Sequence, residues 1–530
     1  MHEISDAPEV KRAHRSELDP LSFLVRSEFI YPDKVAVVHD SRRYTYREFG
    51  QRVRRLASAL QAAGLERGDR VAFIAPNIPA LLEAHFGVPA AGGVLVAINY
   101  RLNSEDAHFI LEHSGARFVF VDHEFEELAE GCDARQIRID DSGEPDDPYE
   151  QFLSEGSAEQ TPRTLENEDE AIAINYTSGT TGRPKGAVYH HRGAYLNALG
   201  EVIETGLTPE SVYLWTLPMF HCNGWCFTWA VTAVGGRHIC LRKVDPERIW
   251  ELIDEEGVTH YNGAPTVQAS LLDHERAHRL EREVITTVSG SPPTAELFAR
   301  LTEAGIRPIH VYGATELYGP YMICERQEGW DELPVDEQAQ LLGRQGVHYL
   351  VAEQARVVAD GGEDVEADGN ALGEVLMRGN TVMTGYFDDP EQTAETFADG
   401  WYHSGDLAVR HPDGYIELRD RKKDIIVSGG ENIATIEVEQ AIAEHPAVAD
   451  VAVVSTPDEK WGERPKAFVE LSEGDGVGED DIMAFAKERL PGFMRPSAVE
   501  ITTLPRTSTG KIQKQQLREK EWEGQERRIG

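Results

Sequence analysis

The chain has 530 residues, of which 41% are hydrophobic, and a formal net charge of −40 at pH 7. It is too long for one hydrophobic core of ordinary size, so we expect two or more domains. The strong negative charge argues against binding to nucleic acid or to anionic membranes, and it suits a protein that stays soluble in a very salty cytoplasm, where salt screens self-repulsion.

The cysteines and the N-terminal sequence both indicate a reducing cytosol. The cysteines are Cys132, Cys222, Cys226, Cys240 and Cys324, without a C-x-x-C pair. His221, Cys222 and Cys226 have no second ligand pair, which favours buried small residues over a zinc site. The start "MHEISDAPEVKRAH" has no apolar signal segment, and the apolar run at 86–98 is too short to span a bilayer. We predict a cytoplasmic protein without a transmembrane segment, for which a homodimer is as compatible as a monomer.

From residue 44 onward, helical and strand patterns alternate. A helical pattern at 46–64 is followed by the runs "RVAFIA", "GVLVAI" and "ARFVFV", which predict βαβ units and a largely parallel sheet. The acidic segment 140–171 is predicted to be a surface connection. The alternation resumes with "SVYLWTLPM", "GVTHYNGAP", "EVITTVSG" and "RPIHVYGATE". Asp-Gly turns within 351–378 predict antiparallel hairpins.

The pattern changes near "ELRDRKKDIIVSGGENI", where a compact α+β unit begins. Eight of the 12 lysines lie between Lys422 and Lys520. We predict an α/β protein with a large N-terminal domain at 1–420, built from mixed, largely parallel sheets flanked by helices and from a β-rich subdomain. A hinge at 421–424 leads to a small, mobile α+β C-terminal domain at 425–530.

The stretch "YTSGTTGRPKGAVYHH", from Tyr176 to His191, has the composition of a phosphate-binding loop. Its glycines leave backbone N–H groups free to converge on an anion. Its hydroxyl donors are Thr177, Ser178, Thr180 and Thr181. The position of Lys185 does not fit a Walker A loop, and "AIAINY" before it and "GAVYHH" after it predict two strands rather than a strand and a helix. A Gly/Ser/Thr hairpin without a ligand is the alternative.

Four other segments carry groups suited to ATP chemistry. "VYGATE" offers the ring of Tyr312 and ends in Glu316, a carboxylate able to take Mg²⁺. "WYHSGD" ends in Asp406, an acceptor for ribose hydroxyls, and "PRTSTGKIQK" holds Lys511. "DRKKD" supplies three more cations. Taken singly, each of these residues is explained equally well by packing or surface charge.

In this order, the five segments resemble the adenylate-forming superfamily, the AMP-binding acyl-CoA synthetases and ligases. The resemblance extends over nearly the whole chain, from "YTYREF" to "RTSTGK", and includes "GYFDDPEQTAETFADGWYHSGD" and "WGERPKAFVEL". It implies a large and a small domain with the site in the cleft between them.

The resemblance also implies which residues form the site. For ATP and AMP these are Thr177, Ser178, Gly179, Thr180, Thr181, Gly182 and Lys185 in the phosphate loop, Gly290, Ser291, Pro292, Tyr312 and Gly313 around the adenine, Thr315 and Glu316 at the α-phosphate, Asp406 and Arg421 at the ribose, and Lys511. Thr177 and Glu316 would hold Mg²⁺, and the catalytic residues would be Lys511, Lys185, Thr177 and Glu316. The substrates and cofactors implied are a carboxylic acid, ATP, CoA and Mg²⁺.

The resemblance places the hinge at Lys423, about which the small domain would turn to present a second face. That face would carry the CoA channel, at Ser428, Gly429, Gly430 and Glu431, with Asn432 ending the loop; its glycines allow a thiol to approach closely. His221, Trp225 and Ala314 would line the acyl pocket, with an aromatic core as the alternative role for Trp225. Serine in "HSGD" and "GSPP" in the adenine segment depart from the family pattern in fine contacts only.

The chemistry agrees with this resemblance. A carboxylate is a poor electrophile, so it must become a mixed anhydride before a thiol can attack it, and catalysis is mainly positioning and charge neutralisation. We expect an ATP-dependent acyl-CoA ligase that forms acyl-AMP from a monocarboxylic, fatty acid, releases pyrophosphate and transfers the acyl group to CoA. The alternatives are an aryl- or branched-acid CoA ligase, or an adenylation enzyme with a carrier-protein acceptor, disfavoured because no carrier domain follows residue 530. A P-loop NTPase, a non-catalytic adenylate binder and a serine hydrolase fit the motifs less well.

Overall fold

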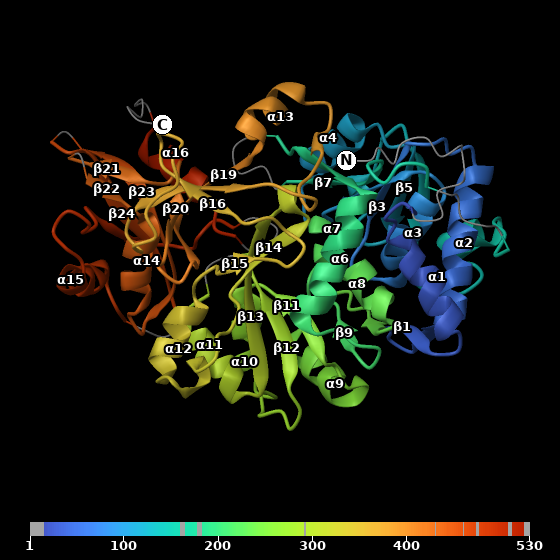
Figure 1. Ribbon diagram of the computed structural model, residues 1–530, viewed down its shortest axis with the longest axis horizontal. Helices are drawn as coiled ribbons and strands as arrows, with labels where there is room; N and C mark the ends of the chain where they lie inside the picture. The colour runs from blue at the N-terminus through green and yellow to red at the C-terminus, as the bar shows by residue number, and fades with distance from the viewer. Residues whose placement is uncertain are drawn as a thin grey trace, which may run out of the picture.

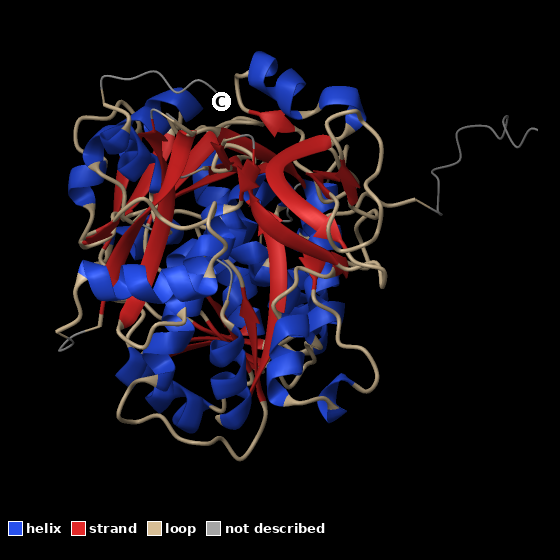
Figure 2. Ribbon diagram, turned by 90° about the vertical axis from the view of Figure 1, so that its left-hand side faces the viewer, coloured by secondary structure: helices blue, strands red, loops and turns tan. Residues whose placement is uncertain are grey.

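The computed structural model describes residues 15–159, 165–177, 183–290, 293–429, 431–458, 460–472, 476–506 and 511–523. Within them the strands form four sheets, and helices surround the strands (Figures 1 and 2). The predicted α/β class, with mixed, largely parallel sheets flanked by helices, is confirmed.

One large sheet has seven strands and carries the segment around residue 180. In spatial order they are β18 (Gly385–Tyr386), β8 (Gly186–His190), β7 (Ala171–Tyr176), β4 (Val94–Ile98), β3 (Arg70–Ile74), β5 (Phe118–Asp122) and β6 (Arg135–Ile139). The pairs between β7 and β6 are parallel, and β8 and β18 are antiparallel. Val71 and Phe73 enter one core whereas Ala72 and Ile74 enter another. Because both of their faces are buried, the inner strands β3, β4 and β5 have nearly continuous apolar sequences.

The other large sheet has nine strands and ends in an antiparallel hairpin next to the candidate site. In spatial order they are β15 (Val347–His348), β14 (Gly319–Ile323), β13 (Ile306–Ala314), β12 (Val284–Val288), β11 (His260–Gly263), β9 (Val212–Leu214), β10 (Arg237–Ile239), β1 (Val35–His39) and β2 (Arg42–Thr45). The strands from β13 to β1 pair in parallel. The largest apolar core contains residues of both large sheets and of the helices between them.

Helices cover these sheets on both faces (Figure 1). The α-helices of the N-terminal part are α1 (Leu21–Ile30), α2 (Tyr46–Ala62), α3 (Pro79–Ala90), α4 (Ser104–Ser114), α5 (Pro148–Ser154), α6 (His191–Thr205), α7 (Cys222–Trp225), α8 (Phe227–Val234), α9 (Pro246–Glu256), α10 (Pro265–Leu272), α11 (Ala295–Glu303), α12 (Val335–Leu342) and α13 (Pro390–Thr396). Short 3₁₀ turns are η1 (Glu126–Leu128), η2 (Thr315–Leu317), η3 (Trp330–Glu332) and η4 (Ala398–Gly400). Helix α2 begins with a capping box, in which Glu48 donates its N–H to Thr45 Oγ1 at 3.2 Å and accepts the Thr45 N–H at 2.7 Å.

Helix α5 corrects the prediction that 140–171 is only a surface connection. Its residues Tyr149, Phe152 and Leu153 are buried, and the Tyr149 hydroxyl donates to Glu83 at 2.8 Å. The start signal was present in the sequence, because Asp147 caps the helix and Pro148 takes its first position. The helix anchors this acidic segment to the core.

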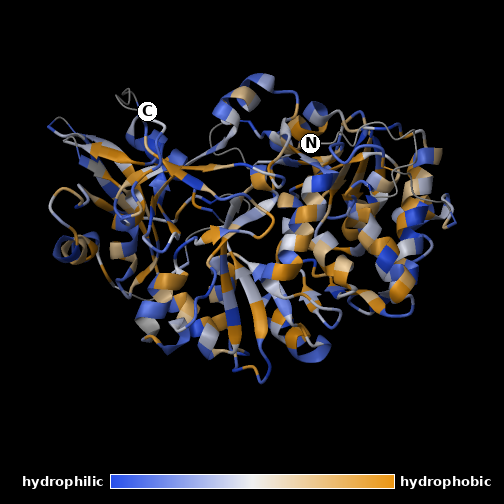
Figure 3. Cartoon of the chain, viewed as in Figure 1, coloured by the Kyte–Doolittle hydropathy of each residue, from blue (hydrophilic) through white to orange (hydrophobic). Residues whose placement is uncertain are grey.

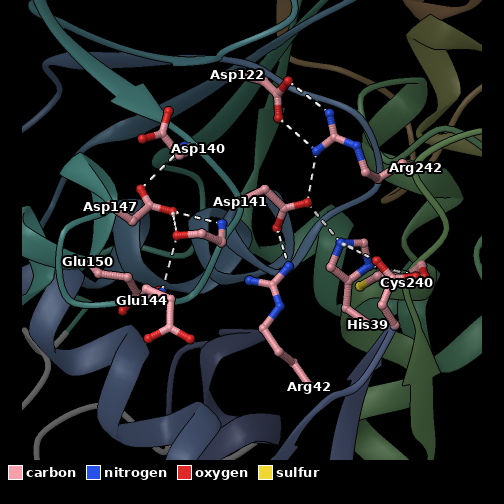
Figure 4. Close-up of polar contacts among 12 residues, drawn as sticks. His39, Arg42, Asp122, Asp140, Asp141, Glu144, Asp147, Glu150, Cys240 and Arg242 are labelled. Atoms are coloured by element: carbon pink, nitrogen blue, oxygen red, sulfur yellow. Dashed lines mark hydrogen bonds and ion pairs between the residues drawn. The ribbon is translucent and has the colours of Figure 1, made fainter.

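An ion-pair network joins β1 and β2 to β5 and to the segment around residue 141 (Figure 4). Asp141 accepts from His39 Nε2 at 2.8 Å, from Arg42 at 2.5 Å and from Arg242 at 2.8 Å. Arg242 also forms two 2.9 Å hydrogen bonds to the buried carboxylate of Asp122. Burial raises the pKa of Asp141, but the hydrogen bonds from His39 and Arg42 and the charge of Arg42 outweigh it and hold this pKa well below its usual range. The network therefore connects the two large sheets through two almost fully buried carboxylates and two partly buried arginines.

Two smaller sheets follow along the chain. The four-stranded antiparallel sheet contains β16 (Arg356–Val358), β17 (Leu372–Met377), β19 (Tyr402–Arg410) and β20 (Ile416–Arg421), which confirms the hairpins predicted there. The five-stranded sheet lies at the left of Figure 1 and contains β21 (Ile426–Ser428), β22 (Glu431–Ile433), β23 (Val448–Asp458), β24 (Gly462–Leu471) and β25 (Val499–Ile501), with helices α14 (Thr435–Ala443), α15 (Glu479–Arg489) and α16 (Lys514–Glu521). The strands change sheet between Arg421 and Ile426; the hinge there stays a prediction.

Hydrophobic residues gather on the strands and on helix faces turned toward them, whereas the outer turns are hydrophilic (Figure 3). Among the described residues, no helix combines the length and the apolar character needed to cross a membrane.

Candidate active site

Lys185 stands at the end of the predicted phosphate loop, between β7 and β8. The loop joins two antiparallel strands, as predicted. Its ends are fixed to each other, because Thr177 donates its N–H to Lys185 O at 2.9 Å and Lys185 donates its N–H to Thr177 Oγ1 at 3.2 Å. The Lys185 Nζ donates to Gln392 Oε1 at 2.5 Å and lies 5.4 Å from the centre of the Tyr386 ring. The ammonium group is thus held beside the segment that follows β18.

Thr315 and Glu316 follow β13 in the turn η2. Tyr386 donates its hydroxyl to Glu316 Oε1 at 2.7 Å, so one tyrosine contacts both Glu316 and Lys185. Tyr189 donates its hydroxyl to the Thr315 carbonyl at 2.5 Å. Cys222 Sγ lies 3.7 Å from Thr315 Oγ1. The strands β8, β13 and β18 and the turn at 222 therefore meet at this point.

Asp406 lies opposite Arg421 in the β19–β20 ladder. Its Oδ1 is 3.4 Å from Arg421 Nε, and its Oδ2 accepts the Tyr312 hydroxyl at 2.5 Å. Burial and the neighbouring carboxylate raise the pKa of Tyr312, so its hydroxyl stays protonated as a donor. Asp406 thus contacts both Arg421, which was assigned with it to the ribose, and Tyr312, which was assigned to the adenine.

Lys511 enters this region from the small domain. A Cβ built on Gly290 would lie 4.0 Å from Lys511 Cε, which places the lysine stem beside the predicted adenine segment. Burial and then the nearby Arg421 guanidinium lower the pKa of Lys511. Three groups act in the opposite direction and favour its charged form: Cys222, Asp406 and Glu316. The structure therefore brings Lys511 together with residues from three other predicted segments.

His221 is a neutral imidazole in this environment. Burial, followed by the charges of Lys511 and Arg101, lowers its pKa to about 3. Arg101 stacks on the Tyr100 ring at 5.3 Å from its centre, and Tyr100 packs edge-on against Phe220. An uncharged His221 adds no repulsion to the cations around it.

Trp225 belongs to an unusual left-handed turn. All five residues from 222 to 226 have φ between +46° and +63°. Residues other than glycine rarely adopt this conformation in succession. The turn is buried, and Asn223 is held by the side chain of Asn175 at 2.5 and 2.9 Å. A Cβ on Gly319 would lie only 2.8 Å from Trp225 Cδ1. Gly319 pairs with Ala314 across β13 and β14, so Trp225 and Ala314, two of the three predicted acyl-pocket residues, both neighbour Gly319.

The predicted hinge and CoA channel lie on the small domain. Arg518 donates to the Lys423 carbonyl at 3.2 Å and pairs with Asp424, which ties this segment to α16. Ser428 and Glu431 pair in the β21–β22 hairpin, and Gly429, at φ +62°, packs under the Trp461 ring. These contacts are all internal to the predicted hinge and small domain, whereas Lys511 lies beside Gly290 of the N-terminal part.

Eight predicted site residues lie outside the described residues: Ser178, Gly179, Thr180, Thr181, Gly182, Ser291, Pro292 and Gly430. Four contacting residues were not predicted: Tyr386, Gln392, Tyr189 and Cys222. The first two belong to "GYFDDPEQT", a segment used only to support the family resemblance. A polar tyrosine and glutamine just ahead of "WYHSGD" were the signal that could have suggested them.

One cluster among the described residues has the composition of a metal site, at Asp122, His123 and Glu124. Arg242 already pairs with both carboxylates, at 2.9 and 3.0 Å. We regard the cluster as part of the ion-pair network of Figure 4.

Comparison with known proteins identifies the family. The model of the AMP-binding enzymes matches residues 27–387, and that of their C-terminal domain matches residues 437–511. The 4-hydroxybutyrate–CoA ligase 2 of Metallosphaera sedula is 46% identical, over 95% of this chain and 94% of its own length. The acetate–CoA ligase of Humulus lupulus is 44% identical, over 98% of this chain and 97% of its own length. The chain belongs to the AMP-binding enzymes, the adenylate-forming superfamily of acyl-CoA synthetases.

Solved structures place the fold in the same family. ATP-bound MatB from Rhodopseudomonas palustris superimposes with a TM-score of 0.84 at 26% identity, covering 94% of this chain and 98% of that one. Its apo form superimposes with a TM-score of 0.73, covering 95% and 99%. The arrangement of this chain is therefore closer to that of the ATP-bound form.

Proposed function

We propose that this AMP-forming acid–CoA ligase acts on a short monocarboxylic acid, and that the present arrangement is the one that forms acyl-AMP. In that reaction a carboxylate oxygen attacks the α-phosphorus of ATP and pyrophosphate leaves. The CoA thiol then attacks the acyl carbon, and AMP leaves with the electrons of the broken C–O bond. The observation that carries the proposal is the stem of Lys511 beside Gly290, where Cys222, Asp406 and Glu316 favour its charged form.

Lys511 would bind the attacking carboxylate and an oxygen of the α-phosphate. These two anionic groups repel each other, and a cation between them lowers the cost of bringing them together. Burial and Arg421 lower the pKa of Lys511, and the carboxylates of Asp406 and Glu316 oppose this by favouring the charged ammonium. Lys185 would neutralise charge that develops on the leaving pyrophosphate, and the loop that includes Thr177 would supply N–H and hydroxyl donors.

The nucleoside would be held by the pair Asp406 and Arg421. A carboxylate accepts both hydroxyls of a ribose, and the guanidinium fixes its orientation through the 3.4 Å contact. Tyr312 donates to the same carboxylate, and this contact supports a role for its ring in the proposed adenine site with Gly290 and Gly313.

Mg²⁺ is implied by the family, and the residues present fit it. Glu316 is half-buried and offers a hard carboxylate oxygen, since Tyr386 engages Oε1 and no described residue engages the other oxygen. Glu316 would hold the ion together with phosphate oxygens and Thr177. The bound ion would neutralise phosphate charge.

The second half-reaction would require the small domain to turn about Lys423. The hairpin that contains Ser428, Gly429 and Glu431 would then replace Lys511 at the cleft and open a path for the CoA thiol. The higher similarity to an ATP-bound relative supports assigning the present arrangement to the first half-reaction.

The acid is proposed to be small because Trp225 occupies the proposed acyl pocket. Its ring packs on Gly319, which leaves no room for a side chain there. The two relatives compared are named for acetate and for 4-hydroxybutyrate, both small acids. Fatty, branched and aryl acids are the competing specificities. We also propose that the enzyme is cytoplasmic and adapted to high salt, on the basis of its −40 charge.

A panel of acids tests the proposal. CoA-dependent release of AMP is measured with acids from acetate to palmitate, and with 2-methylpropanoate, benzoate and cinnamate, in molar KCl. We expect the highest kcat/KM for acids of two to four carbons. A maximum at palmitate or cinnamate would contradict the short-acid specificity, and AMP release that needs an acid but not CoA would favour a carrier-protein acceptor.

A further inference from the structure

Four buried polar side chains form a cluster that the proposed mechanism does not use. They are Asn197, Glu201, Tyr213 and Asn262, and each is at most 1% exposed. We call them the polar cluster. They come from α6 and from two neighbouring strands of the nine-stranded sheet.

Helix geometry and strand register bring these four residues to one place. Asn197 and Glu201 are one turn apart on the same face of α6. His260 lies opposite Tyr213 in the parallel β9–β11 pair, so Asn262, two residues further on, shares the face of Tyr213. Burial and then the neighbouring Glu201 carboxyl raise the pKa of the Tyr213 hydroxyl. The Asn262 amide lies next to the same hydroxyl.

The cluster has unused hydrogen-bonding capacity. Within the part of the chain that the structure describes, five of its buried atoms have no partner in hydrogen-bond geometry, although Tyr213 faces the Asn262 amide and Asn197 faces the Cys226 thiol: Asn197 Oδ1 and Nδ2, Glu201 Oε1, Tyr213 OH and Asn262 Nδ2. Buried polar groups in native proteins are nearly always satisfied, and leaving them unpaired costs stability. Five such atoms on four neighbouring side chains give the cluster hydrogen-bonding capacity that its own side chains do not use.

The left-handed turn connects the polar cluster to the reaction centre. At its start, Cys222 Sγ lies 3.7 Å from Thr315 Oγ1. At its end, the Cys226 thiol lies beside the Asn197 amide and near Glu201. Four residues of helix rise about 6 Å, which is the order of length of a short acyl chain. An acid whose carboxylate reaches Lys511 would thus extend along Trp225 toward the cluster.

We propose that the polar cluster binds a hydroxyl group at the far end of the acyl chain, so that the preferred substrate is a short hydroxy acid. This inference rests on the acid–CoA ligase function proposed above and specifies the substrate class. A hydroxyl both donates and accepts, and so can satisfy the Asn197 amide, the Tyr213 hydroxyl and the Asn262 nitrogen together.

Charge argues against the other polar end groups. Burial raises the pKa of Glu201 well above its ordinary value, and a protonated carboxyl leaves the cluster without charge. The nearby carboxylate of Glu204 also raises the pKa of Glu201. The same negative charge would repel a second carboxylate on the substrate. A methyl end group would leave all five atoms unsatisfied.

The test compares 4-hydroxybutyrate with pentanoate, which has a methyl group in place of the hydroxyl. For the unaltered enzyme, we expect kcat/KM for 4-hydroxybutyrate to be at least about tenfold higher, because a site built for a hydroxyl rejects the analogue that lacks it. Tyr213→Phe removes one donor without changing the ring, and should lower kcat/KM for 4-hydroxybutyrate by about tenfold while leaving pentanoate within about twofold.

Tyr261→Phe is the matched control. Tyr261 is also fully buried, on the strand next to Tyr213, but its hydroxyl is paired with Gln268 at 2.7 Å and it belongs to a different core. It should leave the ratio between the two acids unchanged. A second variant, Asn197→Leu, should reverse the preference in favour of pentanoate. Melting temperatures of all three variants report whether each one is folded.

The inference would be overturned if the unaltered enzyme used both acids equally, as expected if only water fills the cluster, or if Tyr213→Phe lowered both activities alike. Butyrate separates this failure from that of the proposed function. If butyrate yields AMP and the hydroxyl does not change kcat/KM, only the hydroxyl-binding inference is wrong. If none of the three acids yields AMP, both the inference and the proposed acid–CoA ligase function are wrong.

Discussion

Lys511→Ala should nearly abolish acyl-AMP formation and spare thioester formation. The lysine lies among Asp406, Glu316 and Arg421, where it would contact the attacking carboxylate and the α-phosphate. An ion pair at about 4 Å and an effective dielectric constant near 20 contributes on the order of 4 kcal/mol. Losing that interaction in the transition state alone would slow adenylation roughly a thousandfold.

The assay separates the two half-reactions. Adenylation is followed as acid-dependent release of pyrophosphate, and thioester formation as conversion of supplied acyl-AMP and CoA to acyl-CoA. Lys520→Ala is the control, because Lys520 belongs to the same small domain, is 60% exposed and pairs only at the surface, with Glu500. The reasoning would be refuted if a folded Lys511→Ala enzyme kept normal adenylation, or lost both half-reactions to the same degree.

Lys423→Pro should give the opposite pattern. Proline fixes φ near −65° and would stiffen the segment about which the small domain is proposed to turn. We expect adenylation to be kept and thioester formation to be impaired in the same assays. Equal loss of both steps by a folded variant would leave the two-orientation mechanism without support.

Three further predictions concern stability, acid size and salt. Glu201→Gln should raise the melting temperature, and the gain should grow as pH rises above about 4.5. The raised pKa keeps Glu201 protonated in the folded chain, whereas the unfolded chain releases this proton above about 4.5. The unaltered protein therefore loses stability as pH rises over that range, and the Gln variant does not. A difference between the two melting curves that does not depend on pH would contradict this. Gly319→Ala should push Trp225 into the acyl pocket and lower kcat/KM for butyrate relative to acetate by about tenfold, in line with the discrimination of methylene groups. Gly414→Ala, at φ +89° with nothing within 4 Å of the added Cβ, carries similar backbone strain and should leave that ratio unchanged. In dilute buffer below roughly 0.1 M salt, where the Debye length exceeds about 10 Å, the −40 charge should lower the melting temperature, and an unaltered value would argue against salt adaptation.

Much of the fold could be predicted because its signals are local. Continuous apolar runs such as "RVAFIA" predict strands buried on both faces, and these became β3, β4 and β5. The loop between β7 and β8 was predicted from glycine, hydroxyl and strand patterns within 20 residues. Helix α5 was missed because only three apolar residues, Tyr149, Phe152 and Leu153, offset an acidic surrounding sequence.

The parts of the site that could not be predicted depend on contacts between distant segments. Glu316 and Tyr386 are 70 residues apart, and neither sequence context shows that their side chains meet. The sequence signal for the left-handed turn at 222–226 is incomplete: Asn223-Gly224 marks a turn, but Cys222, Trp225 and Cys226 are types that normally avoid positive φ. The polar cluster is likewise hidden, because Asn197 and Glu201 resemble the solvent-facing residues of an ordinary helix until Cys226 and Tyr349, which are distant in sequence, pack against them.

The bond at which ATP is cleaved tests the central claim most directly. The purified chain is incubated with ATP, Mg²⁺, butyrate or 4-hydroxybutyrate and CoA, and the nucleotide and phosphate products are resolved by chromatography. The account predicts AMP and pyrophosphate in equal amounts, formed only when acid is present, together with one equivalent of acyl-CoA. Acid-dependent formation of ADP and orthophosphate would contradict it.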